Sequence, residues 1–242
     1  STSAAIVAAS AGVTIAKHGN RSVSSKSGSA DMLEKIGYKI SNNVEELEDS
    51  ILNKNFCFLF AQNHHSAMKN VINVRKNLAT RTIFNLLGPL TNPAGATKQL
   101  LGVYSRNLVS MHCNCLKDLG SERAMVVHGL DGLDEISLSD NTFINELKND
   151  KILEYTFDPR DFGYDLIKLE EIKGGDPEYN ASCFNKMINK DYEEFQNIIE
   201  INAGAAIYLS NLRDNLKDSF ALAKKVIEEG ITKKFVDSLV NE

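Results

Sequence analysis

The spacing of hydrophobic positions changes repeatedly along the chain and predicts strands that alternate with helices. Short apolar runs at 56–60 (FCFLF), 99–105 (QLLGVYS) and 123–129 (RAMVVHG) are typical of strands, and the first and last read as strands buried on both faces. Helical spacing at 43–52, 66–78 and 108–120 predicts helices around and between them. The segment 82–95 contains two prolines and two glycines, so we expect an irregular connection there.

The two ends of the chain have mainly helical patterns. Residues 3–16 are rich in alanine and predict a tightly packed helix, and 194–211, 216–230 and 231–240 predict three more. From 135–139 to 165–171 the pattern is looser and strand-like. The alternation predicts an α/β fold of one domain, residues 1–242, with a mostly parallel central sheet and helices on both faces.

Composition and charge narrow the function. The chain has 242 residues, 43% of them hydrophobic, and a net charge of −5, which disfavours a nucleic-acid partner. No apolar run approaches the roughly 20 residues that a membrane-spanning helix needs. The four cysteines form no C-x-x-C pair, and this usage suits free thiols in a reducing cytoplasm.

A loop rich in serine and glycine, AKHGNRSVSSKSGSADMLE (16–34), is the first candidate site. Glycine lets backbone N–H groups approach an anion, serine adds hydroxyl donors, and Lys17 and Arg21 add charge-assisted bonds. A helix that opens at Ser29 or Asp31 would add the positive end of its dipole. The loop is therefore either a solvated turn or a cradle for phosphate.

Two further segments carry candidate chemistry. In VVHGLDGLDEISLS (126–139), Asp134 and Glu135 follow a buried strand, and such a turn can hold Mg²⁺ through oxygen beside a substrate phosphate or can be simply acidic. In NHHSAMKNVINVRK (63–76), zinc is disfavoured because no third ligand has a recognisable spacing. Arg75 on this predicted helix is either a surface charge or a bidentate clamp for a carboxylate.

Three ordered, collinear segments resemble anthranilate phosphoribosyltransferases: KHGNRSVSSKSGSADMLE, FLFAQNHHSAMKNVINVRKNLATRTIFNLLGPLTNPAG and HGLDGLDEIS. The resemblance is dense over about residues 1–140 and looser beyond, where it includes INAGAAIYL. It implies the fold of the family's large domain. It also implies transfer of the phosphoribosyl group from 5-phosphoribosyl diphosphate to anthranilate, with release of pyrophosphate and with Mg²⁺ as cofactor.

The resemblance also implies roles for individual residues. Those expected around the phosphate and pyrophosphate of the donor are Ser1, Thr2, Lys17, His18, Gly19, Asn20, Arg21, Ser22, Val23, Ser24, Ser25 and Ser29. Those expected around anthranilate are Asn20, His65, Arg75 and Pro89, and those expected at the metal are Ser1, Asp134 and Glu135. Lys17, Asn20 and Arg75 are the expected catalytic residues.

The sequence also departs from the family pattern, because we expect a small helical domain and a G-T-G-G-D loop before residue 1. That helical domain forms the usual homodimer contact of full-length members. Pyrimidine nucleoside phosphorylases are one rival family; Lys17 and Arg21 fit their K-x-S-x-R loop, but 18–20 and 27–31 fit the anthranilate enzymes better. The sequence leaves two further candidates, a nucleic-acid-binding relative and an inactive piece of the right fold.

Overall fold

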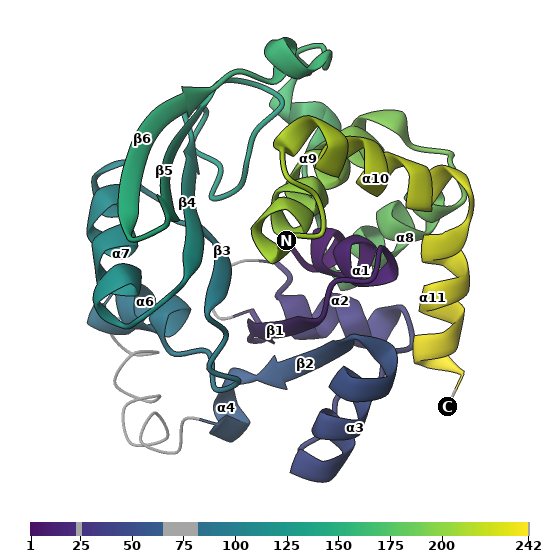
Figure 1. The fold of residues 1–242 in the computed structure, drawn as a ribbon. Coiled ribbons are helices and arrows are strands. Elements are labelled where there is room, and N and C mark those ends of the chain that lie inside the picture. Colours follow the sequence, from purple (N-terminus) through teal and green to yellow (C-terminus); the bar gives the residue numbers. More distant parts are fainter. Residues whose placement is uncertain (23–25, 65–81, 242) are drawn as a thin grey trace.

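The structure is a computed structural model that describes residues 1–22, 26–64 and 82–241. Its strands form two sheets (Figure 1). The smaller sheet pairs β1 (Ile15–Gly19) with β2 (Phe56–Phe60) in parallel. The larger sheet has the order β3 (Lys98–Gly102), β4 (Arg123–Gly129), β5 (Thr142–Lys148), β6 (Lys151–Phe157).

Helices surround both sheets. In the first half of the described chain they are α1 (Thr2–Ser10), α2 (Ser29–Lys35), α3 (Val44–Lys54), α4 (Ala61–His64), α6 (Ile83–Leu87), the 3₁₀ helix η2 (Gly88–Leu90) and α7 (Asn107–Asp118). In the second half they are η3 (Pro159–Phe162), η4 (Leu169–Ile172), α8 (Pro177–Ile188), α9 (Glu193–Ser210), α10 (Leu216–Glu228) and α11 (Ile231–Val240).

Strand β4 shows why helices cover both faces of the larger sheet. Its alternate residues Ala124 and Val126 pack with α7, whereas Met125 and Val127 join the main core with α9. All four residues are at most 1% exposed. A strand that is apolar on both sides needs cover on both sides, so the expected helix layers are confirmed.

The α/β class is confirmed, with differences in the strands. The parallel pairs are β1–β2 and β3–β4, whereas β5 and β6 pair antiparallel, so the described strands form two sheets rather than one mostly parallel sheet. The predicted strands at 56–60, 99–105 and 123–129 are present as β2, β3 and β4. Strand β1 lies partly inside the expected helix 3–16, because its edge pairs with the buried β2. The strand-like region from 135–139 to 165–171 contains the strands β5 and β6, and only its two ends are not strands.

The centre of the helical half is the contact between α1 and α9. Eight of the nine residues of α1 are buried, and most of them are small, so neighbouring helices approach closely. Gly204 of α9 shows the same tightness, since a Cβ there would lie 2.3 Å from Cδ1 of Phe220 in α10. The predicted small-residue helix is therefore confirmed, but it ends at Ser10.

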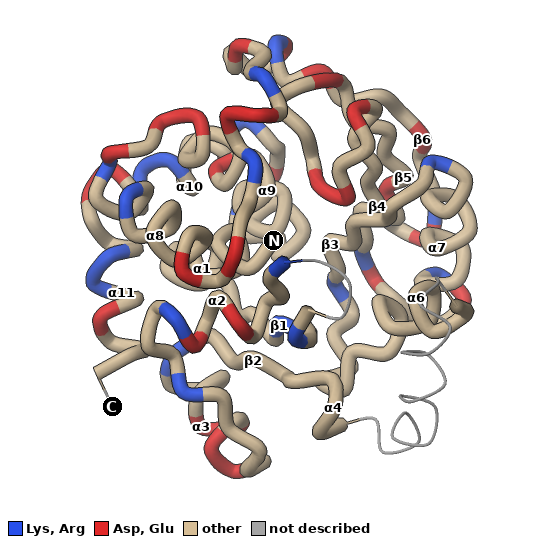
Figure 2. Tube along the Cα trace, turned by 180° about the vertical axis from the view of Figure 1, so that it is seen from behind, with Lys and Arg blue, Asp and Glu red and all other residues tan. Residues whose placement is uncertain are grey.

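The outside of the molecule carries mixed charge. Figure 2 shows Lys and Arg segments interspersed with Asp and Glu segments around the chain, without one broad basic face in that view. Within the described residues, no helix combines the length and apolar character needed to cross a bilayer.

Candidate active site

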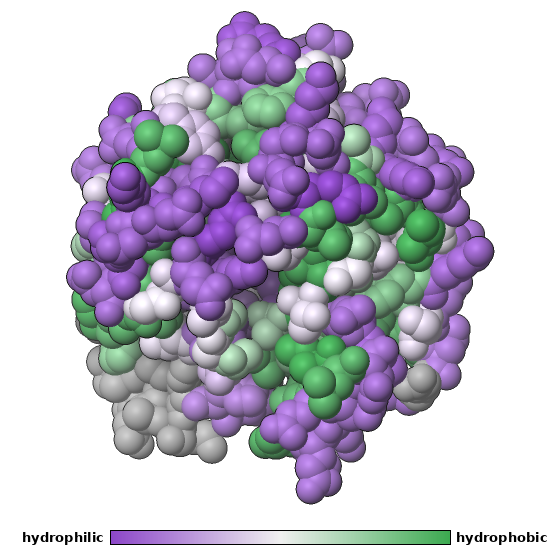
Figure 3. Space-filling model, viewed as in Figure 1, coloured by the Kyte–Doolittle hydropathy of each residue, from purple (hydrophilic) through white to green (hydrophobic). Residues whose placement is uncertain are grey.

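A cleft of about 1380 Å³ opens between the two sheets. It is lined by every residue of β1 and β3, the edge strands that bound the smaller and larger sheets. Figure 3 shows a hollow near the middle of this face, between the regions that Figure 1 labels β1 and β3. The cleft therefore brings together the loop after β1 and the acidic turn after β4, which are more than 100 residues apart in the sequence.

The end of β1 places Lys17, His18, Gly19 and Asn20 along one side of the cleft. Lys17 Nζ donates to Ser1 Oγ at 3.3 Å. Burial lowers the pKa of the Lys17 ammonium, and the nearby carboxylates of Glu135 and Asp134 oppose that shift. Lys17 is thus a half-buried basic group in the cleft, close to an acidic pair.

Asp134 and Glu135 also line the cleft. The turn that carries them begins after β4 and is held by Asp131, whose carboxylate accepts from Leu133 N at 3.0 Å and from the hydroxyls of Ser137 and Ser139. Glu135 also contacts the main-chain nitrogen of Ser1. The fold therefore brings the acidic turn into the same cleft as Lys17.

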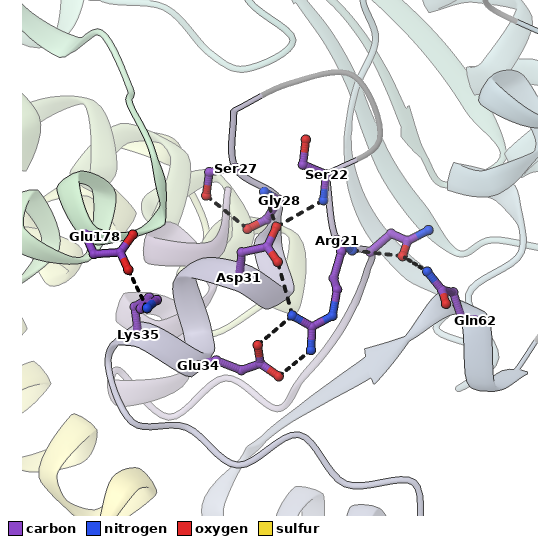
Figure 4. A network of polar contacts seen from close by, with 10 residues as sticks. Arg21, Ser22, Ser27, Gly28, Asp31, Glu34, Lys35, Gln62 and Glu178 are labelled. Atoms are coloured by element: carbon purple, nitrogen blue, oxygen red, sulfur yellow. Dashed lines mark hydrogen bonds and ion pairs between the residues drawn. The ribbon is translucent and has the colours of Figure 1, made fainter. Parts of the chain in front are cut away.

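Residues 20–22 after β1 lie against residues 28–34 at the start of α2 (Figure 4). Arg21 donates to both carboxylate oxygens of Glu34, at 2.7 and 2.5 Å, and to Asp31 at 3.2 Å. Asp31 also accepts from the N–H groups of Ser22 (3.1 Å) and Gly28 (2.8 Å). Burial acts to raise the pKa of Asp31, but these N–H groups and the guanidinium outweigh it, so the pKa is lowered.

This network differs from the expectation that Arg21 contacts the phosphates of the donor. Its guanidinium binds the carboxylates of α2 and does not line the cleft, and Thr2, Ser22 and Ser29 are likewise outside the cleft lining. Gly28 makes the close approach of the two segments possible, since a Cβ there would lie 2.4 Å from Ser22 N. Val23, Ser24 and Ser25 lie outside the described residues.

The residues expected around anthranilate are placed in part. Asn20 and Pro89 both line the cleft, together with Gln62, His64 and Phe84. Gln62 Nε2 donates to Asn20 Oδ1 at 3.2 Å, an orienting contact visible in Figure 4. His65 and Arg75 lie outside the described residues.

Three side chains that sequence reasoning did not single out support the cleft. Gln62 orients Asn20; Asn92 Nδ2 donates to Ala16 O of β1 at 3.0 Å; and Asn202 of α9 bonds the backbone beside the acidic pair. Asn202 had a signal in the sequence, because it is a polar residue inside the apolar stretch INAGAAIYL. Gln62 and Asn92 had none, since amides are ordinary in loops.

Comparison with known proteins identifies the family. The family model described as "Glycosyl transferase family, a/b domain" matches residues 1–233. Anthranilate phosphoribosyltransferase of Methanobrevibacter smithii is 45% identical over 240 residues, which are 99% of this chain and 72% of that protein. The chain belongs to the anthranilate phosphoribosyltransferase family.

Solved anthranilate phosphoribosyltransferases share the fold. The crystal structure of the Thermus thermophilus enzyme superposes with a TM-score of 0.92 at 39% identity, covering 100% of this chain and 72% of that one. The Saccharomyces cerevisiae enzyme, in complex with PRPP (5-phosphoribosyl diphosphate) and Mg, gives 0.87 at 27% identity, covering 100% and 68%. The family relationship therefore extends over the whole described fold.

The donor atoms in this anthranilate phosphoribosyltransferase fold suit a hard cation. Asp134 and Glu135 present carboxylate oxygens to the cleft, and Mg²⁺ is commonly bound by one or two carboxylates, water and substrate phosphate. Within the described ranges, no group of three or more His, Cys, Asp or Glu side chains forms a complete metal cage. The residues therefore fit an ion whose remaining ligands come from substrate and water.

Proposed function

We propose that the chain transfers the 5-phosphoribosyl group of 5-phosphoribosyl diphosphate to the amine of anthranilate and releases pyrophosphate, in tryptophan biosynthesis. The 45% identity to an anthranilate phosphoribosyltransferase over 99% of the chain carries this proposal. Relatives from Saccharomyces cerevisiae are solved with PRPP and Mg and, at 26% identity, with 4-fluoroanthranilate. The cleft supports it further, because it brings Lys17 together with a pair of carboxylates.

We assign the diphosphate of the donor to the side of the cleft at Lys17, His18, Gly19 and Asn20. Lys17 offers a charged donor, and Gly19 is close-packed, since a Cβ there would lie 2.9 Å from Cε2 of Phe58. The missing side chain lets the end of β1 pack against Phe58 of the neighbouring strand. The β1 end thus holds Lys17 on a tightly packed strand at the cleft.

We assign anthranilate to the side of the cleft at Asn20 and Pro89. Gln62 and the N–H of Arg21 (2.8 Å) both donate to Asn20 Oδ1, which leaves the amide N–H₂ of Asn20 as a donor for ligand. His65 and Arg75 are proposed from the sequence for the same substrate, Arg75 for the carboxylate. The aromatic amine is a weak base that is largely unprotonated at neutral pH, so positioning contributes more than a strong general base.

We assign Mg²⁺ to Asp134 and Glu135, with the hydroxyl of Ser1 nearby through its contact with Lys17. When bound, the ion supplies a Lewis acid for the oxygens of the leaving pyrophosphate. Negative charge develops on that leaving group as the anomeric carbon gains oxocarbenium character. Lys17 lies in the same cleft and would stabilise this charge as a preorganised electrostatic group.

The proposal is tested by following the loss of anthranilate fluorescence with 5-phosphoribosyl diphosphate and Mg²⁺. The matched pair of variants is Asp134→Asn in the cleft and Asp140→Asn on the exposed end of the same turn, which is outside the cleft lining. We expect kcat to fall about 100-fold or more for Asp134→Asn, a typical loss for one electrostatic group, and to stay near the parent value for Asp140→Asn.

Rival activities are tested in the same preparation. Phosphorolysis of thymidine and a salt-dependent gel shift with nucleic acid should both be absent. A folded protein that releases thymine or shifts nucleic acid, and leaves anthranilate unchanged, would overturn the transferase proposal. A longer version that includes the expected G-T-G-G-D region is assayed beside this chain. If the longer version alone consumes anthranilate, the family activity is supported and belongs to the longer protein.

We also place the reaction in the cytoplasm. All four cysteines fall within the described residues and are free thiols: Cys57, Cys113 and Cys183 are buried and Cys115 is half-buried. Unpaired thiols are usual in a reducing compartment. The substrates are small polar molecules, which agrees with that placement.

A further inference from the structure

Asn202 of α9 directs its side-chain amide at the segment that carries the acidic pair. Its Oδ1 accepts from Ile136 N at 3.0 Å, and its Nδ2 donates to Ile136 O at 2.9 Å and to Ile198 O at 2.9 Å. The residue is only 3% exposed. Both amide hydrogens and the acceptor oxygen are therefore used, and two of the three bonds go to a single residue directly after Glu135.

A two-point contact of this kind fixes orientation as well as position. The N–H of Ile136 belongs to the peptide unit that joins it to Glu135, so Asn202 limits rotation of that unit. Ile136 itself is fully buried and anchors the same point in the core. Glu135 thus projects into the cleft from a backbone whose next residue is held by a helix 66 residues away.

The other side of the acidic pair is held by a close backbone approach. A Cβ on Gly102 of β3 would lie 1.5 Å from the carbonyl oxygen of Asp134. Helix α9 packs against both β3 and β4, so the two supports belong to one rigid assembly. The pair is therefore held from β3 at Asp134 and from α9 just after Glu135.

We propose that Asn202 is a positioning residue for the carboxylates of Asp134 and Glu135, and through them for a divalent cation with oxygen ligands. This inference rests on the proposed function, which assigns the cation to that pair. Groups that orient metal ligands change metal affinity by about 10–100-fold when they are removed. Asn202 does not contact the ion; it determines the positions of the two carboxylate ligands.

The side-chain chemistry explains why an amide is needed at this position. An aspartate could accept from Ile136 N, but its oxygens would face two carbonyl oxygens without a hydrogen to donate. A leucine has similar bulk but leaves the buried N–H and C=O of Ile136 without partners. Leucine therefore removes every bond of the Asn202 amide, whereas aspartate removes the two that Nδ2 donates with nearly unchanged shape.

The test uses Asn202→Asp and Asn202→Leu, with Ile201→Val as a matched control in the same helix. Ile201 is also fully buried, so the control perturbs α9 packing while keeping the hydrogen bonds of the Asn202 amide. Mn²⁺ affinity is measured by electron paramagnetic resonance, and the Mg²⁺ dependence of anthranilate turnover by fluorescence. Circular dichroism at the assay temperature establishes that each variant is folded.

We expect the Mn²⁺ Kd, and the Mg²⁺ concentration for half-maximal rate, to rise about 10–100-fold for both Asn202 variants. KM for anthranilate at saturating Mg²⁺ should stay within about twofold, because the acceptor side of the cleft is unchanged. Ile201→Val should match the parent in both metal measurements even when its thermal midpoint falls.

Parent-like Mn²⁺ affinity in a folded Asn202 variant would overturn the inference. Failure of both variants to fold would also overturn it, since Asn202 would then be a residue of core stability. Asp134→Asn distinguishes a failure of the proposed function from a failure of the positioning role. Unchanged Mn²⁺ binding in that variant would reject the assignment of the metal to Asp134 and Glu135. Lost binding there, with parent-like binding in both Asn202 variants, rejects only the positioning role.

Discussion

The carbonyl oxygen of Asp134 lies against Gly102, so close that any side chain on Gly102 would overlap it: an added Cβ would be 1.5 Å away. Real Cβ atoms do not approach a backbone oxygen at that distance, and the obstacle is main chain rather than a flexible side chain. Gly102 ends β3 at the cleft. The position of the acidic pair therefore depends on a missing side chain in a neighbouring strand.

Gly102→Ala should displace Asp134 from its place in the cleft. We expect about 10–100-fold weaker Mn²⁺ binding and a comparable loss of turnover at fixed Mg²⁺, because ligand placement rather than ligand identity changes. The measurements are Mn²⁺ titration and anthranilate fluorescence. Gly174→Ala is the control, since a Cβ there would meet only the Asn180 side chain, at 3.2 Å. Equal metal binding in both variants would show that the turn adapts without cost.

The Arg21–Glu34 ion pair should behave as a surface brace with a small energy. The two side chains are 46% and 40% exposed, so solvent screens the pair. We expect Arg21→Met and Glu34→Gln each to lower the free energy of unfolding by less than about 1 kcal/mol. The double variant should lose no more than the larger single loss, because either change breaks the same contact. Urea denaturation of the four proteins measures this, and additive losses would contradict it.

The same variants test how Arg21 relates to the donor. In the structure its guanidinium is directed at α2, so Glu34→Gln weakens its attachment there and leaves the contact with Asp31. If Arg21 turns to the phosphates in the complex, Glu34→Gln should lower KM for 5-phosphoribosyl diphosphate or leave it unchanged, whereas Arg21→Met should raise it. A rise of similar size in both variants would instead assign the effect to the shape of the loop.

Stability should fall with rising pH through the titration of Glu200. This residue is fully buried in α9 and accepts from Gln196 Nε2 at 2.7 Å and from the hydroxyl of Tyr164 at 3.3 Å. Burial raises its pKa, and the Gln196 bond, Lys224 and the Tyr164 bond only partly offset this. The folded state therefore holds the proton more tightly than the unfolded state does, and the associated stability is lost as pH rises through the folded pKa.

The pH window starts near about pH 4.3, the usual pKa of an unfolded glutamate. Above it, the parent should lose about 1.4 kcal/mol for each unit by which the folded pKa exceeds the unfolded one. Glu200→Gln has no proton to release, so the difference in unfolding free energy between parent and variant should change with pH in this window. Thermal denaturation across about pH 4–8 measures it, and a constant difference would rule out a shifted Glu200.

Thiol reactivity should single out Cys115. Burial raises the pKa of Cys57 to about 11, and burial, aided by Glu146, raises that of Cys113 to about 11. Cys183 is buried, whereas Cys115 is half-buried on α7. We expect one fast equivalent with Ellman's reagent at about pH 8 in the folded protein, because only an accessible thiolate attacks readily. Cys115→Ser should remove the fast phase, and a fast phase that remains would contradict this.

The sequence predicted the strands β2 and β4 well because their signals are local. A continuous apolar run needs cover on both faces wherever it sits in the fold. Strand β1 was missed for the opposite reason: IAKHG has a short, mixed pattern and becomes a strand because the buried β2 offers it a parallel edge. The helix α8 was also missed, although Asp176 caps it and Pro177 starts it, signals that are strong once the boundary is known.

The candidate site likewise combines features that the sequence determined with features that only the fold decided. By itself the sequence determined which chemical groups are available. They are the cation of Lys17 in a serine- and glycine-rich loop and the carboxylates of Asp134 and Glu135 in a turn. Only the tertiary structure decided that these segments share one cleft, that Arg21 turns to α2, and that Gly102 and Asn202 hold the acidic turn. The physical reason is that charge and hydrogen-bonding capacity are properties of the residue type. The direction in which a side chain points depends instead on contacts with residues far away in the chain.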